Sequence, residues 1–299
     1  MTVERSLILA IEREHGLLLR TSDEFQFGES RHATPVVDQL DRRWVLKATS
    51  ATDSSASDLH RLTQIVASLR RDGYPAAEIV AAGVLDGWAY TLLERLPGQP
   101  LDLGIDGSPD VSTLDLVLDE LIDLVGMHFG RGDLEDPPWP HWLFRTLEVG
   151  GEGYCIHETM TRGADTAAIL EAVQRIAATC RAGPASDVVH FDLNFANILS
   201  DGRRITGIVD WSIPFTGAGQ GDASFDLATL LFYAYDHRPS RDRLRRELES
   251  TASADATALY LAHLILRQVE WAVRHYPGQA SEQRFLQIAN EVLCDLGTH

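Results

Sequence analysis

The feature that most constrains this chain is a set of polar residues at fixed spacing, enclosed by apolar segments. Residues 190–197 read HFDLNFAN, and residues 208–211 read IVDW. A short strand leaves the first motif, Asp201-Gly202 is a hairpin turn signal, and a second strand returns antiparallel into the second motif. The sequence therefore predicts a loop followed by a hairpin that brings Asn197 and Asp210 opposite each other at one end.

Residues of these types at this spacing suit phosphoryl transfer, in which catalysis consists mostly of positioning and charge stabilisation. Asn197 and Asp210 would supply two oxygen ligands to Mg²⁺, a hard cation that takes few protein ligands and keeps several waters. Asp192, earlier in the loop, can face the hydroxyl group of an acceptor and take its proton late. His190 is expected to hydrogen-bond the loop backbone, with a proton-shuttling role as the alternative. We therefore predict Asp192 as the catalytic residue and Asn197 and Asp210 as metal ligands.

These motifs and a third one resemble the aminoglycoside phosphotransferase family, whose members phosphorylate antibiotics and other small hydroxyl compounds. The third motif reads GDASFDLA over residues 221–228, and the second continues as Asp210-Trp211-Ser212 where eukaryotic protein kinases have Asp-Phe-Gly. The resemblance covers about residues 20–275 and is sharpest over 188–230. It implies that Asp226 braces the catalytic loop from behind.

The resemblance also implies the fold class, which is α+β: a protein-kinase-like fold of two lobes. Residues 1–95 would form a small β-rich N-terminal lobe that binds the nucleotide, and residues 96–299 a larger helical lobe with the catalytic loop and the acceptor site. Local patterns predict strands at 33–37, 44–48, 79–85 and 88–94, and helices at 3–15, 57–70, from 112 onward, and at 164–180, 239–250, 253–275 and 281–296.

Three places in the N-terminal third are predicted to contact a nucleoside triphosphate, ATP or GTP. Lys47, the sole lysine, lies in the strand sequence WVLKA and would contact the inner phosphates, unless it points to water from an edge strand. Ser30, in the loop sequence GESRH, would assist backbone N–H groups over the phosphates, although an ordinary hairpin turn fits as well. Backbone groups of Glu94 and Leu96, at a predicted hinge, would meet the base, although an ordinary loop explains them equally.

One expected residue is missing on the nucleotide side. The resemblance implies a glutamate in the helix at 57–70 that pairs with Lys47, but the apolar pattern puts Leu62 there. Asp58, one turn earlier, and Gln64 are the nearest substitutes. This departure motivates a non-enzymatic alternative, a kinase-fold regulator that binds nucleotide without turnover. A hydrolase whose metal is held by the histidine and aspartate of the first motif lacks a second histidine cluster.

Acidic residues are concentrated in one segment. The net charge is −18, and residues 101–140 carry ten acids against one base, Arg131, which makes −9. The ten are Asp102, Asp106, Asp110, Asp115, Asp119, Glu120, Asp123, Asp133, Glu135 and Asp136. Such a field repels nucleic acid and anionic membranes and attracts polycations. The segment is either a solvated acidic surface or part of a site for a cationic acceptor, and the second interpretation is preferred.

The acceptor is therefore predicted to be a small cationic antibiotic, an aminoglycoside or a basic peptide, whose phosphorylation would confer resistance. The alternatives are a metabolic acceptor (choline, homoserine or a sugar) and a macrolide, the last because of aromatic residues such as Trp142 and Phe144. Residues 131–165 are rich in Gly, Pro and Trp and are interpreted as an irregular insertion near the acceptor. Glu152 and Glu158 are candidate substrate ligands by location only, with ordinary surface acids as the alternative.

Composition indicates a soluble enzyme, since 299 residues with 44% hydrophobic content can bury a large core. Three distant cysteines, Cys155, Cys180 and Cys294, argue against a disulfide framework and for a reducing compartment. The first twenty residues are amphipathic and include glutamates, so no signal peptide is expected. We expect a cytoplasmic monomer or homodimer.

Overall fold

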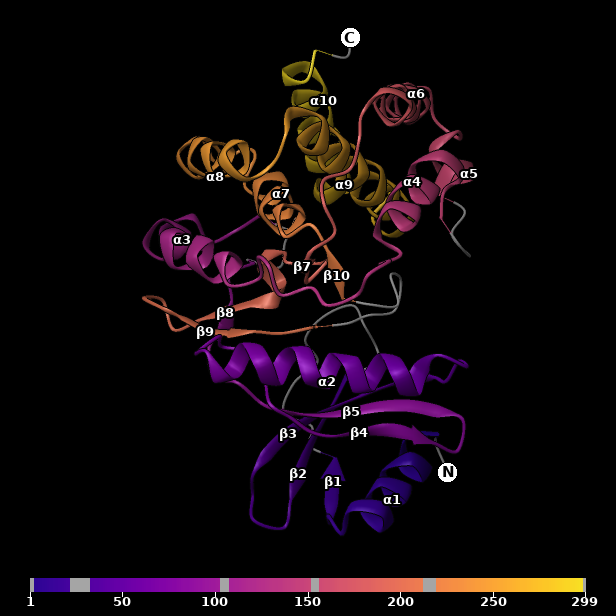
Figure 1. Ribbon diagram of the computed structural model, residues 1–299, viewed down its shortest axis with the longest axis vertical. Coiled ribbons are helices and arrows are strands. Elements are labelled where there is room, and N and C mark those ends of the chain that lie inside the picture. Colours follow the sequence, from indigo (N-terminus) through magenta and orange to yellow (C-terminus); the bar gives the residue numbers. More distant parts are fainter. Residues whose placement is uncertain (1–2, 22–32, 103–107, 152–155, 212–218, 298–299) are drawn as a thin grey trace.

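A five-stranded antiparallel sheet makes up most of the N-terminal lobe of the computed structural model, which describes residues 3–21, 33–102, 108–151, 156–211 and 219–297 (Figure 1). In the order β1-β2-β3-β5-β4, its strands span Leu19–Thr21 (β1), Ala33–Asp38 (β2), Arg43–Ser50 (β3), Trp88–Glu94 (β5) and Ile79–Leu85 (β4). Helix α1 (Val3–His15) lies against the sheet, and its residues Leu7 and Ile11 join Leu46 and Leu92 in a small buried core.

Turn chemistry sets the register of this sheet. Between β4 and β5, Asp86 and Gly87 both have positive φ, 50° and 80°. A two-residue turn of this kind matches the twist of antiparallel strands, and Asp-Gly is one of its preferred sequences. The predicted hairpin is therefore present, and it pairs Leu85 with Trp88. Because β3 pairs with β5 through Lys47 and Thr91, the sole lysine lies on a central strand and not on an edge.

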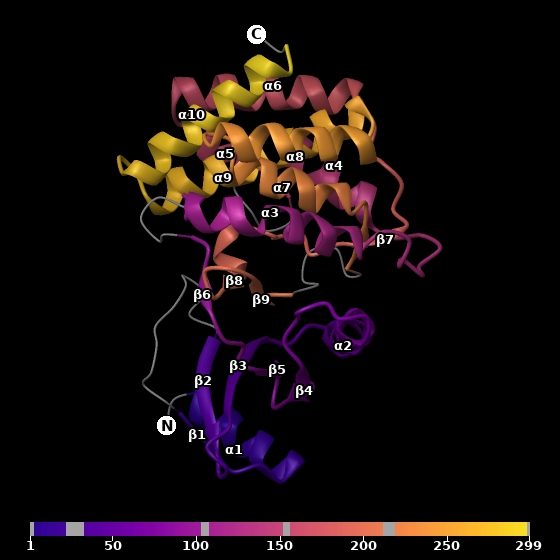
Figure 2. The ribbon, with the colours of Figure 1, turned by 90° about the vertical axis from the view of Figure 1, so that its left-hand side faces the viewer.

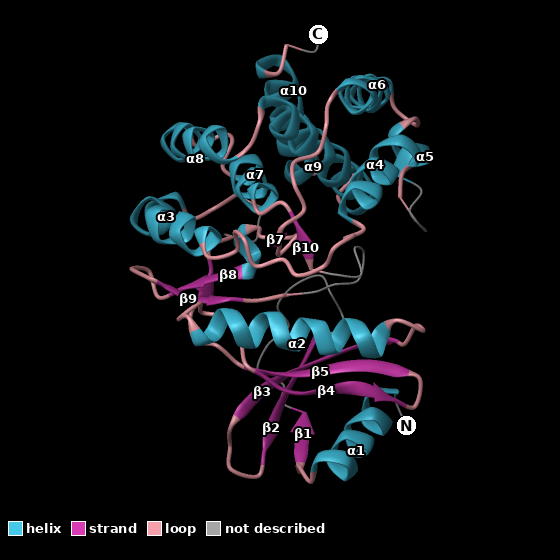
Figure 3. Cartoon of the chain, in the orientation of Figure 1, coloured by secondary structure: helices cyan, strands magenta, loops and turns pink. Residues whose placement is uncertain are grey.

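The C-terminal lobe consists mainly of helices (Figure 3). They are α3 (Val111–Gly126), α4 (Trp139–Val149), α5 (Ile156–Met160), α6 (Ala164–Thr179), α7 (Ser224–Tyr233), α8 (Arg238–Thr251), α9 (Ala254–His275) and α10 (Ala280–Asp295). The short strands are β6 (Gln99–Pro100), β7 (Asp187–Val188), β8 (Ile198–Ser200), β9 (Ile205–Ile208) and β10 (Gln220–Gly221). Helix α9 packs against α4, α5, α6, α7 and α10, so it is the centre of the lobe. The α+β fold class is confirmed, and in the described residues no helix has the length and apolarity to cross a bilayer.

The interpretation of residues 131–165 as irregular is wrong for two stretches, which form α4 and α5. Pro140 does not oppose a helix here, because it lies in the first turn of α4, where a missing N–H costs little. Gly150, with φ of 82°, ends the same helix in the left-handed conformation. Glycine and proline here mark the ends of a helix, and the apolar residues between them are its buried face.

Helix α2 (Ser55–Arg71) packs against β4 and β5 (Figure 2). Its buried residues Leu62, Ile65, Val66 and Leu69 belong to the large core that continues through the C-terminal helices, and not to the core beneath the sheet. The loop after α2 continues the contact, because the N–H of Ile208 donates to the Pro75 carbonyl over 2.8 Å. Helix α2 therefore contacts the sheet through β4 and β5 and shares its buried residues with the core of the C-terminal lobe.

Candidate active site

The catalytic loop begins with a strained backbone that one buried carboxylate stabilises. Phe191 has φ of 69°, an unfavourable conformation for a residue with a Cβ. The side chain of Asp226, at the start of α7, accepts hydrogen bonds from the N–H of His190 (2.9 Å) and of Phe191 (3.1 Å). It also accepts one from Nδ1 of His128 (3.0 Å), and no part of Asp226 is exposed. These contacts are the structural reason to expect a bracing role for Asp226.

His190 ties the loop to the second motif. Its Nε2 donates to the carbonyl of Val209 over 2.9 Å, and its ring lies 4.6 Å from that of Trp211. Burial lowers the pKa of the imidazole more than the charges of Asp226 and Asp192 raise it, so the ring is neutral at pH 7. A neutral ring that donates from Nε2 has no proton on Nδ1. The contacts are those of a support for the loop, as the sequence suggested.

The hairpin brings the predicted metal ligands together. Ile198 pairs with Ile208, and the N–H of Val209 donates to the carbonyl of Asn197 over 2.9 Å, which places Asp210 one residue beyond that bond. The Asn197 side chain donates from Nδ2 to the backbone carbonyl of Asp192 (2.8 Å) and to its carboxylate (3.3 Å). The amide nitrogen is thereby used, and the amide oxygen is directed away from Asp192.

Lys47 reaches this group from the other lobe. Its ammonium donates to the carboxylate of Asp210, whose backbone has φ of 64°. Burial alone would raise the pKa of the Asp210 carboxyl, but the charge of Lys47 more than offsets this effect and lowers it. Residues 47, 192, 197 and 210, predicted from three separate stretches of sequence, therefore form one connected group.

The donor set fits a divalent cation of the magnesium type. Asp210 already holds a cationic group, and the amide oxygen of Asn197 belongs to a side chain oriented by its bonds to Asp192. One carboxylate and one amide oxygen, completed by waters and phosphate oxygens, are the usual environment of Mg²⁺ at a nucleotide site. When bound there, the ion would offset negative charge on the phosphates.

The other predicted nucleotide contacts have different outcomes. Ser30 lies outside the described residues. The N–H of Glu94 donates to the carbonyl of Glu78 over 2.8 Å, so the idea that this N–H meets the base is wrong, and only the carbonyl of Glu94 is left for that role. Leu96 packs against Gly207 of β9. Within the described residues Asp58 makes no ion pair with Lys47, whose partner is Asp210. Any role of Leu96 or Asp58 in nucleotide binding stays a prediction.

The structure gives little support to the predicted acceptor ligands Glu152 and Glu158. Glu152 lies outside the described residues. Glu158, on α5, is exposed and pairs with Arg162 on the same helix over 2.8 Å, which is the arrangement of an ordinary surface acid.

At least five of the ten acids in residues 101–140 also have partners within the chain. Asp110 caps α3, Asp115 contacts Ser240, Asp119 pairs with Arg243, Glu120 accepts from the N–H of Ile205, and Asp133 pairs with Arg61. Three of these five contacts hold α3 against α8 and the β8–β9 hairpin. The acidic segment therefore acts largely in folding, and its support for a cationic acceptor is weakened.

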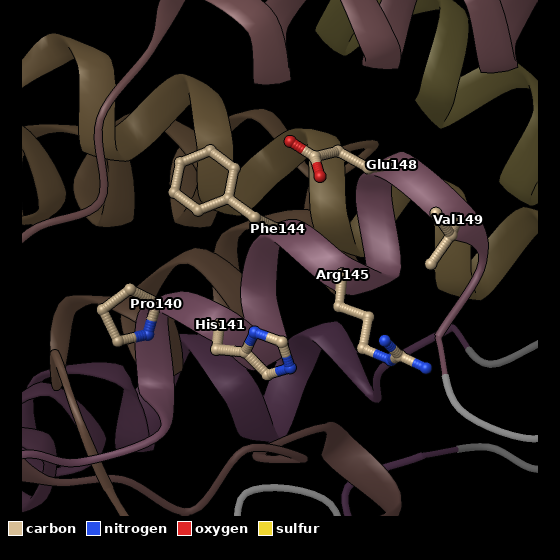
Figure 4. Close-up of a pocket in the computed structure, with 6 residues that line it drawn as sticks. All are labelled: Pro140, His141, Phe144, Arg145, Glu148 and Val149. Atoms are coloured by element: carbon tan, nitrogen blue, oxygen red, sulfur yellow. The ribbon is translucent and has the colours of Figure 1, made fainter.

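Two features of the structure were not predicted from the sequence. Asp187, buried just before the loop, accepts from the N–H of Gly130 (2.8 Å) and of Ala223 (3.0 Å), so it joins three segments. An aspartate at the start of the short apolar segment Val188-Val189 was the available signal. The second feature is a cavity of about 300 Å³ along α4, and Figure 4 shows His141 and Arg145 on one side of that helix and Phe144 and Glu148 on another. It does not include the connected group.

The comparison with protein families identifies the chain. Residues 28–261 match the model of the phosphotransferase enzyme family, and the chain belongs to that family. A comparison with curated proteins gives no match.

Solved structures of similar fold agree with this assignment. A thermostable mutant of aminoglycoside phosphotransferase APH(4)-Ia, in a ternary complex with ADP and hygromycin B, is 18% identical, with a TM-score of 0.61 over 97% of this chain and 98% of that one. Aminoglycoside phosphotransferase APH(3'')-Id from Streptomyces rimosus is 16% identical, with a TM-score of 0.53 over 89% and 99% of the two chains. Macrolide 2'-phosphotransferase type I is 16% identical, with a TM-score of 0.55 over 98% and 97%.

Proposed function

We propose that this protein transfers the terminal phosphoryl group of ATP or GTP to a hydroxyl group of a small molecule, and that the molecule is an antibiotic. The single observation that carries the proposal is the connected group formed by residues 47, 192, 197 and 210. Asn197 binds Asp192 and Lys47 binds Asp210, while the hairpin holds the two pairs side by side. A kinase-fold regulator without turnover has no need of this arrangement.

Each side chain has a distinct role in this reaction. Asp192 accepts a hydrogen bond from the acceptor hydroxyl, orients it toward the terminal phosphorus and takes its proton as the new P–O bond forms and the bond to the leaving ADP or GDP breaks. Asn197 restrains the Asp192 carboxylate through its hydrogen bond. Lys47 moves from Asp210 to the inner phosphates, and Asp210 with the Asn197 oxygen would hold Mg²⁺. His190 and Asp226 keep the loop backbone in its strained conformation.

The nature of the acceptor rests on the neighbours. Structures with this fold include enzymes named for aminoglycosides and for macrolides, some complexed with ADP or GDP. We place an aminoglycoside or basic peptide antibiotic first and a macrolide second, with choline, homoserine and sugars as metabolic alternatives. The scattered cysteines and the acidic surface support a cytoplasmic enzyme that binds neither nucleic acid nor membranes.

A nucleotide-consumption assay tests the proposal. Purified protein with Mg²⁺ and ATP or GTP is incubated with a panel of aminoglycosides, basic peptide antibiotics, macrolides and amino alcohols, and products are identified by their mass. Transfer to one class, lost in Asp192→Ala, supports the proposal. Nucleotide binding without transfer to any acceptor would establish the regulator instead.

A further inference from the structure

The guanidinium of Arg267 is unusual among the arginines of this acid-rich chain. Arg267 lies on α9 and is half-buried, and its Nη1 is inaccessible and has no hydrogen-bond partner in the described part of the chain. Its recorded contact is with the ring of Trp142, 5.9 Å from the guanidinium carbon to the ring centre. A guanidinium nitrogen that is shielded from water and bonds nothing is unfavourable, because it loses hydration and gains little in return.

Other arginines nearby are paired. Arg274, two turns further along α9, bonds Glu270 over 2.8 Å, although Glu270 is also one turn from Arg267. Arg284, on α10, bonds Asp236 over 2.9 Å. Carboxylates are therefore within reach of this region, and in the described ranges of the chain none pairs with Arg267.

The imidazole ring of His263, which packs beside Trp142, carries no charge that would repel Arg267. His263, one turn earlier on α9, is fully buried, its two ring nitrogens have no partner in the described residues, and its ring lies 4.4 Å from that of Trp142. Burial, and then the charge of Arg267, lower the pKa of His263 well below its usual value, so the ring is neutral. Of the three side chains Trp142, His263 and Arg267, Arg267 is therefore the one that carries a positive charge.

This place adjoins the catalytic loop. The ring of Trp142 lies 5.4 Å from that of Phe191, the residue before Asp192. Burial raises the pKa of the Tyr233 phenol, the charge of Asp192 raises it further, and the charge of Arg267 lowers it. One phenol is thus within electrostatic reach of both the catalytic carboxylate and the unpaired guanidinium.

We propose that Arg267 is an acceptor-binding residue, whose guanidinium donates hydrogen bonds to an oxygen-bearing, uncharged or anionic group of the acceptor. Trp142 and His263 hold the guanidinium in place from α4 and α9. A second cation at this place would be repelled, so the residue selects acceptors that present a hydroxyl, ether or carboxylate oxygen there and carry any ammonium group elsewhere. The inference rests on the proposed phosphotransferase function and adds a determinant of its specificity.

Kinetics of three variants test this residue. Arg267→Met keeps the apolar contact with Trp142 and removes the donors, Arg267→Gln keeps a donor without the charge, and Arg274→Met is the control on the same helix. For Arg267→Met we expect the KM of the acceptor to rise about tenfold or more, as for loss of a charge-assisted hydrogen bond, while the KM of the nucleotide stays within about twofold. Arg267→Gln should recover most of the loss if the oxygen is a hydroxyl or ether, and little if it is a carboxylate.

Thermal unfolding gives a readout that does not depend on turnover. Arg267→Met should leave the Tm unchanged or raise it, because an unpaired buried charge is removed. Arg284→Met should lower the Tm, because Asp236 loses its partner. A fall in Tm for Arg267→Met as large as that for Arg284→Met would assign Arg267 to the core and overturn the inference. If the wild-type enzyme is active and Arg267→Met has the same KM for the acceptor, the inference about Arg267 is also overturned. If the wild-type protein transfers phosphate to no acceptor, the proposed function is refuted, and the inference about Arg267 with it.

Discussion

The catalytic loop in the C-terminal lobe and the Lys47 strand in the N-terminal lobe are held in different ways. The loop is anchored by Asp226, which is fully buried and bonds three donors, and by the hydrogen bond from His190 to the second motif. Among the residues that the structure describes, Lys47 has one charged partner, Asp210, and the two side chains are 25% and 39% exposed. Several buried hydrogen bonds hold the catalytic loop in place. In the described residues, a single exchangeable ion pair holds the Lys47 side chain.

This difference suits the two tasks. Positioning a hydroxyl group needs a carboxylate that does not move, and a buried network provides it. Binding a nucleotide needs a cation that can leave its partner for a phosphate. A half-exposed ion pair contributes little to stability, so the exchange is inexpensive. Leu62 of helix α2, at the position where the resemblance implied an acid, is buried in the large core, so that position offers Lys47 no carboxylate.

The largest effect is expected at the catalytic loop. Asp192→Ala should lower the transfer rate about a thousandfold or more, because the acceptor hydroxyl loses its orienting base, while nucleotide affinity stays nearly intact. Steady-state kinetics and nucleotide titration measure the two quantities. Glu171→Ala, on the exposed side of α6, is the control and should transfer at the wild-type rate. An equal loss of nucleotide binding in Asp192→Ala would contradict the assigned role.

Asp210→Ala should reduce nucleotide affinity in Mg²⁺ to the level measured for the parent protein in a chelator. The reason is that the carboxylate is the one charged ligand assigned to the ion. Calorimetric titration with and without Mg²⁺ makes the comparison. Nucleotide binding by the parent protein that is indifferent to Mg²⁺ would exclude this role for Asp210.

Asp226→Ala should lower the free energy of unfolding by about 3 kcal/mol, because two backbone N–H groups and the His128 ring lose a buried acceptor. Urea denaturation measures this quantity. Asp119→Ala, which removes an exposed partner of Arg243, should change stability little. Comparable losses in the two variants would show that the loop is not held more firmly than the surface.

Lys47→Ala should weaken nucleotide binding about tenfold, as expected for a lost bond to a phosphate, with almost no change in stability. Lys47→Arg keeps the charge and should recover part of the affinity. If Lys47→Ala unfolds several degrees lower than the parent in a thermal melt, the Lys47–Asp210 pair is structural and the contrast between the two regions disappears.

The smallest effect is expected for Asp58→Ala, where nucleotide affinity should change by no more than about twofold, the range of an ordinary surface substitution. Asp58 has no ion pair with Lys47 among the described residues. The same titration, run beside Lys47→Ala, tests this, and a tenfold loss would show that Asp58 takes the place of the missing glutamate once nucleotide binds.

Much of the framework could be predicted from the sequence because its signals are local. The hairpin of the two motifs depends on a turn at Asp201-Gly202 and on the residues beside it, so spacing alone placed Asn197 near Asp210. The β4–β5 hairpin was predicted residue for residue from Asp86-Gly87. Helix α4 was missed because Gly and Pro were counted by composition, although their positions at its two ends were the informative part.

By itself, the sequence determined the class of chemistry: the types and spacing of Asp192, Asn197 and Asp210 are short-range properties of one loop and one hairpin. The tertiary structure alone decided which partners those residues take. Lys47 meets Asp210 across 163 positions of chain, and Arg267 forms no ion pair with the described residues although Glu270 is close to it on the same helix. Such choices depend on how helices and strands pack against one another, and no local pattern of residues encodes that packing.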